Sequence, residues 1–511
     1  MSEVSRTEGP RAAAPADVCL ILEGTYPYVT GGVSSWIHQL VTAMPELRFA
    51  IFHISATQGE THPPRYTMPP NVVSLVDLGI HGGDEPARRG PSRSGAVTEA
   101  AAWEMMWRYH EEMKDGRADG LGDLLRQVSP HAGAGPSVHE YIYGKPAWEI
   151  VRRLYESRAP DISFVDYFWT WRFTHLPIFR LLHAPVPEAR VYHTVSTGWA
   201  GFVAAVTRLR RGRPMLLTEH GIYSRERRME IDQADWIYVQ RQAPMTLSAG
   251  PGFFKELWAR LFERLSRITY AHADQIVTIF EGNRQAQIRD GADPAKTLVV
   301  PNGLDPGPLG ALPRTAPAPG EFRIGFVGRV VPIKDVKTFI RAVKIVTTAL
   351  PGASAVIAGP GDEDPAYLEE CRALAAALGI AERVEFTGRV DVKTIYPRID
   401  VMVLTSISEG LPLVILEAFA AGIPVVSSEV GACRELLEGR LPADRALGAS
   451  GLVTGLADPA ATGRAILTLA QDGGLREEMA RAARARVREH YQEADLIRRY
   501  REIYGDLLRA P

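Results

Sequence analysis

Short apolar runs alternate with stretches of helical periodicity along most of this chain. The first run, VCLILEG (18–24), has strand length, and VSSWIHQLVTAM (33–44) after it carries apolar residues at helical spacing. Further strands of the first half are predicted at 49–56, 71–80, 162–168, 190–196, 215–220, 275–280 and 297–303. Strands that alternate with helices indicate parallel sheets built from βαβ units.

A Pro-rich stretch at 303–322 precedes a second series of the same kind. Its strands are predicted at 322–330, 354–361, 383–390, 400–406 and 423–431, and its helices near 335–350, 365–379, 409–421, 473–489 and 493–508. The expected fold class is α/β, with two Rossmann-like domains that face a cleft and helices at the C-terminus.

The same pattern predicts the domain bounds. We expect a disordered leader at 1–16 and an N-terminal domain at 17–305, which carries an insertion at about 81–160. A C-terminal domain is expected at 306–490, followed by a helix at 491–511 that packs back on the N-terminal domain.

Composition narrows the function. Lys and Arg number 58 against 60 Asp and Glu, a formal net charge of -2, which argues against non-specific nucleic-acid binding. Cys19, Cys371 and Cys433 are far apart and show neither a disulfide framework nor metal-ligand spacing. The N-terminus lacks the apolar core of a signal peptide, and no apolar run has membrane-spanning length. We therefore expect a cytoplasmic protein.

The segment SEGLPLVILEAFAAGIPVVSS (408–428) is the strongest chemical candidate. Glu409 falls in a loop after a predicted buried strand, and Glu417 lies eight residues later inside an apolar helix. Taken singly, Glu417 is better explained as an exposed helix residue and Glu409 as an acid at a helix start. Together they stand beside amides that open at a helix N-terminus, and an ionised carboxylate accepts hydrogen bonds from sugar hydroxyls.

Basic and glycine-rich loops follow other predicted strands. In GRVVPIKD (328–335), Arg329 and Lys334 follow a strand and suit a diphosphate, although two surface cations explain them equally well. Gly31 and Gly32 precede a helix, where a backbone can approach a phosphate, but such pairs are often simple turns. His220 follows a strand and is suited to contact a substrate, or is structural.

These motifs jointly resemble the retaining glycosyltransferases of family 4, which have the GT-B fold. GRVVPIKD, VPNGLD (300–305) and the two glutamates stand in the family's order, and the resemblance covers residues 17–508. LILEGTYPYVTGGVSSW (20–36) and LTEHGIYSRER (217–227) further resemble the cytoplasmic glycosyltransferases of Pel exopolysaccharide synthesis. The insertion is longer than in a minimal family member, so the acceptor is not inferred from other members.

The resemblance implies roles for named residues. Glu417 would bind the ribose hydroxyls and Glu409 the donor sugar, while Arg329 and Lys334 would hold the diphosphate. His220 would line the sugar near the reacting carbon, and His220, Glu409, Arg329 and Lys334 would act in catalysis. The remaining donor-binding residues are implied to be Gly31, Gly32, Val390, Gly410, Leu411, Pro412 and Leu413.

The implied reaction transfers a sugar from a UDP-sugar, either UDP-N-acetylhexosamine or UDP-glucose, to a growing exopolysaccharide with retention of configuration. It implies no cofactor beyond this substrate and no obligate metal, with closure of the two domains assembling the site. The implied partners are inner-membrane polysaccharide synthase proteins, which would recruit the protein to the membrane. Two alternatives stay open: a nucleotide-sugar 2-epimerase and a non-catalytic nucleotide-sugar-binding regulatory subunit. A nicotinamide oxidoreductase is disfavoured because no G-x-G-x-x-G fingerprint is present.

Overall fold

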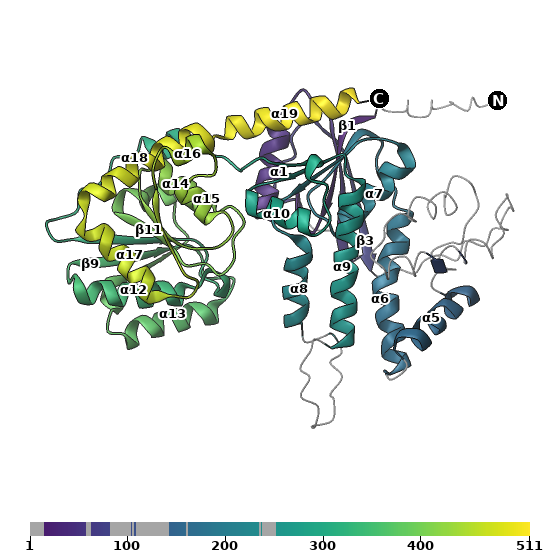
Figure 1. The fold of residues 1–511 in the computed structure, drawn as a ribbon, viewed down its shortest axis with the longest axis horizontal. Helices are drawn as coiled ribbons and strands as arrows, with labels where there is room; N and C mark the ends of the chain where they lie inside the picture. Colours follow the sequence, from purple (N-terminus) through teal and green to yellow (C-terminus); the bar gives the residue numbers. More distant parts are fainter. Residues whose placement is uncertain are drawn as a thin grey trace, which may run out of the picture. The chain divides into compact units, whose positions relative to one another are not determined.

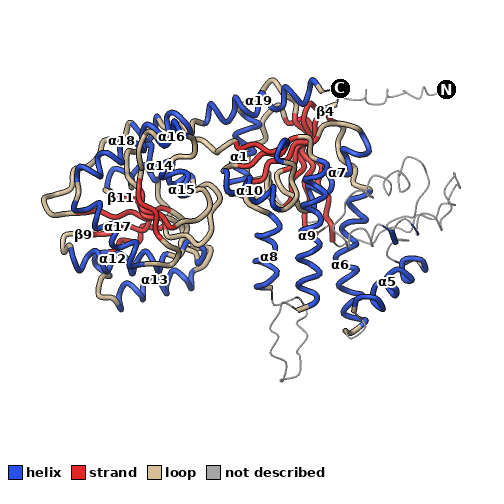
Figure 2. The backbone as a smooth tube through the Cα atoms, viewed as in Figure 1, coloured by secondary structure: helices blue, strands red, loops and turns tan. Residues whose placement is uncertain are grey.

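The computed structural model describes residues 15–57, 63–81, 104, 107–108, 143–159, 162–234, 237 and 252–510. The predicted leader and most of the predicted insertion lie outside these ranges. The chain forms two compact units, shown in Figure 1 and Figure 2. Unit 1 comprises residues 1–277, 286–298 and 501–511, and unit 2 comprises residues 278–285 and 299–500.

Unit 1 is built on a seven-stranded sheet in the order β3-β2-β1-β4-β5-β6-β7. Its strands are β1 (Ala16–Glu23), β2 (Phe49–Thr57), β3 (Val72–His81), β4 (Ala189–Thr194), β5 (Met215–Glu219), β6 (Gln275–Thr278) and β7 (Thr297–Val299). β1 pairs in parallel with both β2 and β4, so the strand order reverses beside β1. In open α/β sheets, ligands bind at the carboxyl ends of the strands at such a reversal.

Helices pack on this sheet and on one another. They are α1 (Gly32–Thr42), α5 (Lys145–Arg158), α6 (Phe164–Leu182), α7 (Trp199–Arg211), α8 (Tyr223–Gln233) and α9 (Phe253–His272). Residues 18–22 of β1 are fully buried, which explains why the strand is a continuous apolar run rather than an alternating one.

The strand predicted at 162–168 is wrong, because α6 begins at Phe164. Ser163 caps the helix: its hydroxyl accepts from the Asp166 amide at 3.4 Å. Asp166 also lies in the first turn, where a negative charge stabilises a helix. The aromatic residues here have strand propensity, but Tyr167 and Trp171 lie four apart and are both buried in the core, which requires the helical period.

Unit 2 is built on a six-stranded parallel sheet in the order β10-β9-β8-β11-β12-β13. The strands are β8 (Phe322–Val327), β9 (Ala353–Ala358), β10 (Val384–Gly388), β11 (Val401–Leu404), β12 (Val425–Ser428) and β13 (Gly451–Thr454). The helices are α11 (Gly307–Gly310), α12 (Val336–Ala349), α13 (Pro365–Ala377), α14 (Leu413–Ala420), α15 (Cys433–Glu438), α16 (Pro442–Arg445), α17 (Pro459–Gln471) and α18 (Gly473–His490). Of these elements, β13, α11, α15, α16 and α17 were not predicted.

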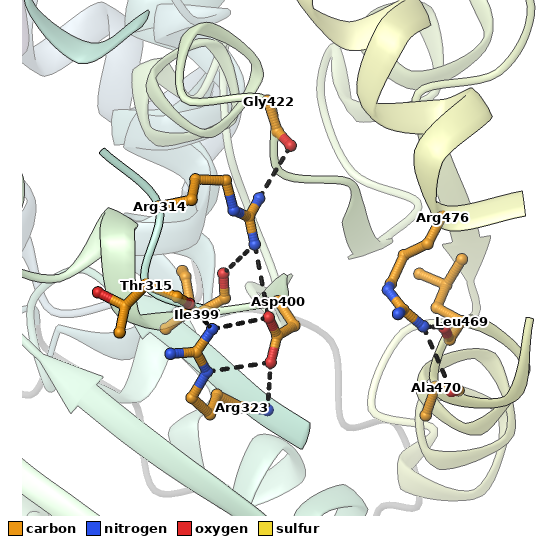
Figure 3. A network of polar contacts seen from close by, with 9 residues as sticks. All are labelled: Arg314, Thr315, Arg323, Ile399, Asp400, Gly422, Leu469, Ala470 and Arg476. Carbon is orange, nitrogen blue, oxygen red and sulfur yellow. Dashed lines mark hydrogen bonds and ion pairs between the residues drawn. The ribbon is translucent and has the colours of Figure 1, made fainter. Parts of the chain in front are cut away.

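The Pro-rich stretch after residue 303 is fastened to unit 2 by the network in Figure 3. Asp400, directly before β11, accepts hydrogen bonds from the Arg323 amide at 2.9 Å and from the Arg323 guanidinium at 2.9 and 3.1 Å. Arg314, inside the Pro-rich stretch, donates to the carbonyls of Ile399 at 2.8 Å and Gly422 at 3.1 Å. Residues 299–305 also belong to unit 2, where Leu304 exchanges backbone hydrogen bonds with Tyr491 and Glu493.

Two helices contain residues of both units: α10 (Glu281–Arg289) and α19 (Glu493–Arg509). The end of α19 packs on the sheet of unit 1. The Tyr504 hydroxyl is 2.7 Å from His193 Nδ1, and Arg501 forms an ion pair with Glu46 at 2.6 Å. Across the described ranges, no helix combines the length and hydrophobicity needed to cross a bilayer.

Candidate functional site

The loops after β8 and β11, which are neighbouring strands, bring Lys334 and Glu409 together. Lys334 Nζ lies 2.5 Å from Glu409 Oε1, and the Ser406 hydroxyl donates to the same oxygen at 2.5 Å. The two charged side chains are only 18% and 11% exposed, so the pair is largely shielded from water. A carboxylate has two oxygens, so one that is paired through Oε1 keeps its second oxygen for a further hydrogen bond.

Local backbone contacts hold these two loops in register. The Ile407 amide donates to the Ile333 carbonyl at 2.9 Å, and the Thr405 hydroxyl donates to the Lys334 and Asp335 carbonyls. Gly431 approaches from the loop after β12: a Cβ there would lie 2.2 Å from the Glu409 carbonyl oxygen. This contact, at φ +51°, requires glycine, and it supports the backbone of the Glu409 loop from behind.

Glu417 lies on α14, which begins directly after the Glu409 loop. The Tyr396 hydroxyl donates to Glu417 Oε2 at 2.7 Å, and burial holds the pKa of Tyr396 well above its usual range. This bond fixes one carboxylate oxygen and orients the other. Pro412 is the N-cap of α14, with no side-chain cap and no acid in the first turn, so the helix start favours an anion.

Arg329 follows β8. It forms an ion pair with a carboxylate that the sequence did not predict as its partner. Its Nη1 donates to both carboxylate oxygens of Glu363, at 2.6 and 2.7 Å, from the loop after β9. These side chains are 52% and 55% exposed, so the pair is open to solvent. Val390 follows β10 and is also exposed. The predicted donor-binding residues of unit 2 therefore lie at the carboxyl ends of neighbouring strands.

In unit 1, Gly31 and Gly32 form the start of α1. Gly31 is the N-cap, with no side-chain cap bond and no acidic residue in the first turn. A Cβ built on either glycine meets no heavy atom within 4 Å. The first amides of α1 thus remain approachable, as an anion-binding helix start requires.

His220 follows β5 and packs against α1. Its ring meets Trp36 edge-on, with the centroids 4.8 Å apart. Burial lowers the pKa of His220 to about 4, so the imidazole is neutral near pH 7 and can donate one hydrogen bond. Unit 1 therefore places the His220 loop against the helix that begins at Gly32.

The arginines that follow His220 are not a free basic patch. Arg225 lies 3.6 Å from Asp290, Arg227 pairs with Glu230 at 2.5 Å, and Arg228 contacts Glu256 and Glu263 at 3.2 and 3.0 Å. In the described part of the chain, no three His, Cys, Asp or Glu side chains are grouped to hold a metal ion.

The sequence interpretation missed Glu23, the last residue of β1. Its carboxylate accepts from the Trp199 amide at 2.9 Å and the Tyr223 hydroxyl at 2.6 Å. An acid at the end of a buried strand was the available signal.

Comparisons with known proteins divide along the chain. Residues 16–295 match the family model described as "Domain of unknown function (DUF3492)", and residues 321–472 match "Glycosyl transferases group 1". A D-inositol 3-phosphate glycosyltransferase of Actinosynnema mirum is 33% identical over 183 residues, which are 33% of this chain and 42% of the relative. One of Streptomyces avermitilis is 31% identical over 242 residues, or 43% and 47%. The chain thus spans less than half the length of these curated relatives.

Solved structures share the fold along nearly the whole chain. Anabaena HepE in complex with UDP aligns with a TM-score of 0.55 at 15% identity, covering 96% of this chain and 100% of that one. Sucrose-phosphate synthase of Thermosynechococcus elongatus aligns at 0.56 and 16% identity, covering 97% and 100%. The predicted GT-B fold, with two Rossmann-like sheets, is confirmed.

Proposed function

This chain belongs to the family defined by the domain of unknown function DUF3492, and we propose that it is a retaining glycosyltransferase that uses a UDP-sugar. The group 1 glycosyl transferase domain at 321–472 contains the residues on which the proposal rests. The observation that carries it is the Lys334–Glu409 pair, in which Glu409 belongs to the loop before α14, the helix that contains Glu417. This arrangement offers a cation for a diphosphate and two carboxylates for hydroxyl groups.

In the proposed reaction, the bond between the anomeric carbon and the diphosphate oxygen breaks. The acceptor hydroxyl attacks on the same face of the sugar, and its proton passes to the leaving phosphate oxygen. Arg329 and Lys334 stabilise the charge that develops on the diphosphate. Glu417 binds the ribose hydroxyls, Glu409 binds the sugar, and Val390 lies by the base.

For unit 1 we propose that the Gly32 amide contacts the diphosphate and that His220 contacts the sugar. A neutral imidazole suits this role, because it can donate a hydrogen bond to a sugar oxygen without placing a positive charge beside an electron-poor anomeric carbon.

The acceptor is proposed to be a growing exopolysaccharide of the Pel type. Residues 20–36 and 217–227 support this, since they resemble PelF, the glycosyltransferase of that system. The two segments contact each other twice in unit 1: the Tyr223 hydroxyl donates to Glu23, and the His220 ring packs against Trp36. UDP-N-acetylhexosamine and UDP-glucose are the proposed donors, and inner-membrane synthase proteins the proposed partners.

The test is to titrate UDP into the full chain by calorimetry and then to measure UDP release from UDP-N-acetylglucosamine, UDP-N-acetylgalactosamine and UDP-glucose. UDP binding together with UDP release and unchanged rates in EDTA would support the transferase. Conversion of the donor to its 2-epimer would identify an epimerase. UDP binding without any turnover, even with membrane partners and acceptor present, would identify a regulatory subunit.

A further inference from the structure

Glu23 is a carboxylate held at the carboxyl end of β1, where the strand order reverses. It is 13% exposed. Its Oε2 accepts from the amides of Trp199 and Ala200, at 2.9 and 3.4 Å, at the start of α7. Its Oε1 accepts from the Tyr223 hydroxyl at 2.6 Å. Glu23 therefore joins β1, α7 and α8 at one point.

Tyr223 connects Glu23 to the loop that contains His220. The loop His220–Gly221–Ile222 runs between Glu219, at the end of β5, and Tyr223, the first residue of α8. The Tyr223 amide donates to Glu219 Oε1 at 3.0 Å, while the Tyr223 hydroxyl reaches Glu23. Both flanks of the loop are thus fixed by hydrogen bonds to carboxylates.

Glycines allow the close packing that these bonds need. A Cβ at Gly198 would lie 2.3 Å from the Tyr223 ring, and one at Gly221 would lie 1.8 Å from Glu226 Oε1. Arg227 stacks on Tyr223, with its guanidinium 5.0 Å from the ring centroid, and forms an ion pair with Glu23 Oε1 at 3.7 Å. The ring of Tyr223 consequently has little freedom to move, and neither does the loop that precedes it.

Burying the carboxylates of Glu23 and Glu219 costs free energy of folding. Burial raises the pKa of both Glu23 and Glu219, because each carboxylate gives up hydration. Apolar side chains of similar size fill such positions at equal or better stability. Buried polar groups with their bonds satisfied fix one local conformation, which apolar packing does less sharply.

We propose that Tyr223 and Glu23 are positioning residues, which hold the His220 loop in the orientation that donor turnover requires. This inference rests on the proposed function. It adds that Tyr223 acts through His220 rather than by touching the nucleotide, whose proposed contacts are residues of unit 2 and the Gly32 amide. The Tyr223 hydroxyl should therefore affect turnover and leave the affinity for UDP unchanged.

The experiment compares Tyr223→Phe with Tyr155→Phe in the full chain. Tyr155 is the matched control, since its hydroxyl also makes a 2.6 Å hydrogen bond in unit 1, to the Ile162 carbonyl, and its ring packs against Phe164 and Tyr167 of α6. Three quantities are measured for each: kcat for UDP release, the Kd for UDP, and the His220 Cε1–H resonance assigned with a His220→Asn variant.

For Tyr223→Phe we expect kcat to fall at least tenfold, the Kd for UDP to stay within twofold, and the His220 resonance to shift, whereas Tyr155→Phe changes none of these. Equal kcat in the two variants, or a parallel loss of UDP affinity in Tyr223→Phe, would overturn the assignment. A wild-type protein that releases no UDP, even with acceptor and membrane partners present, refutes the proposed function instead. In that case the His220 resonance still decides the positioning: an unshifted resonance in Tyr223→Phe refutes it.

Discussion

The ribose assignment of Glu417 predicts a specific loss of UDP affinity in Glu417→Gln. Tyr396 donates to Glu417 Oε2 at 2.7 Å, and we expect it to hold the glutamine carbonyl oxygen in the same way. The glutamine NH₂ group then faces the ribose, and it cannot accept from a hydroxyl. Hydrogen bonds to a charged acceptor contribute about 1.5–3 kcal/mol, so the Kd for UDP should rise roughly 10- to 150-fold.

Calorimetric titration with UDP and with 2′,3′-dideoxy-UDP isolates this contact. Wild type should bind the dideoxy compound 10- to 150-fold more weakly than UDP, by roughly the same 1.5–3 kcal/mol, and Glu417→Gln should bind both alike. Glu429→Gln is the control, because Glu429 lies in the same unit, pairs with Arg434 at 2.7 Å and is solvent-exposed. A Glu417→Gln protein that still prefers UDP over its dideoxy analogue would refute the ribose role.

Three further predictions follow from ion pairs and burial. Lys334→Met leaves the Glu409 carboxylate shielded without its cation and should destabilise unit 2 by about 3 kcal/mol; in thermal unfolding, Lys334→Met with Glu409→Gln should regain stability without regaining UDP binding. Glu363→Gln releases Arg329 from a solvent-exposed pair, which is worth at most about 1 kcal/mol, so the UDP affinity should rise by up to about fivefold in calorimetry. Burial lowers the pKa of His193 to about 3, so protons bind the unfolded chain first as the pH falls below 6.5, and stability is lost. Between pH 7.5 and 5.0, urea unfolding should show wild type losing about 2 kcal/mol more than His193→Asn; equal losses would contradict this.

The fold could be predicted from the sequence because parallel strands that are buried on both faces consist of continuous apolar residues. Residues 18–22, for example, are all buried, and no helical period competes in so short a run. The pattern failed at 162–168, where aromatic residues suit either structure. There the Ser163 cap and the core contacts of Tyr167 and Trp171 decide for a helix.

The candidate site residues of unit 2 could be predicted from the sequence for a different reason. Glu409 and Lys334 each follow a strand, and topology alone brings neighbouring strand ends together. The partners of other residues, in both units, could not be predicted from the sequence. Glu363 binds Arg329 across 34 residues, and Tyr223 binds Glu23 across 200, so no local spacing encodes either contact. Such pairs depend on how loops pack after the sheet has formed.

Lys334 and Arg329, the two proposed diphosphate ligands, differ in how easily a diphosphate can displace the carboxylate that each one binds. Lys334 is bound to Glu409 in a shielded pair that Ser406 also supports, so separating it would leave a carboxylate without its partner. Arg329 is bound to Glu363 in water, where exchange of one anion for another costs little. We therefore expect the diphosphate to take Arg329 from Glu363 and to join Lys334 while Glu409 stays in place. On this reasoning Glu409 contacts the sugar as a lysine-bound carboxylate, and the neutral variant Glu409→Gln should weaken UDP-sugar binding more than UDP binding.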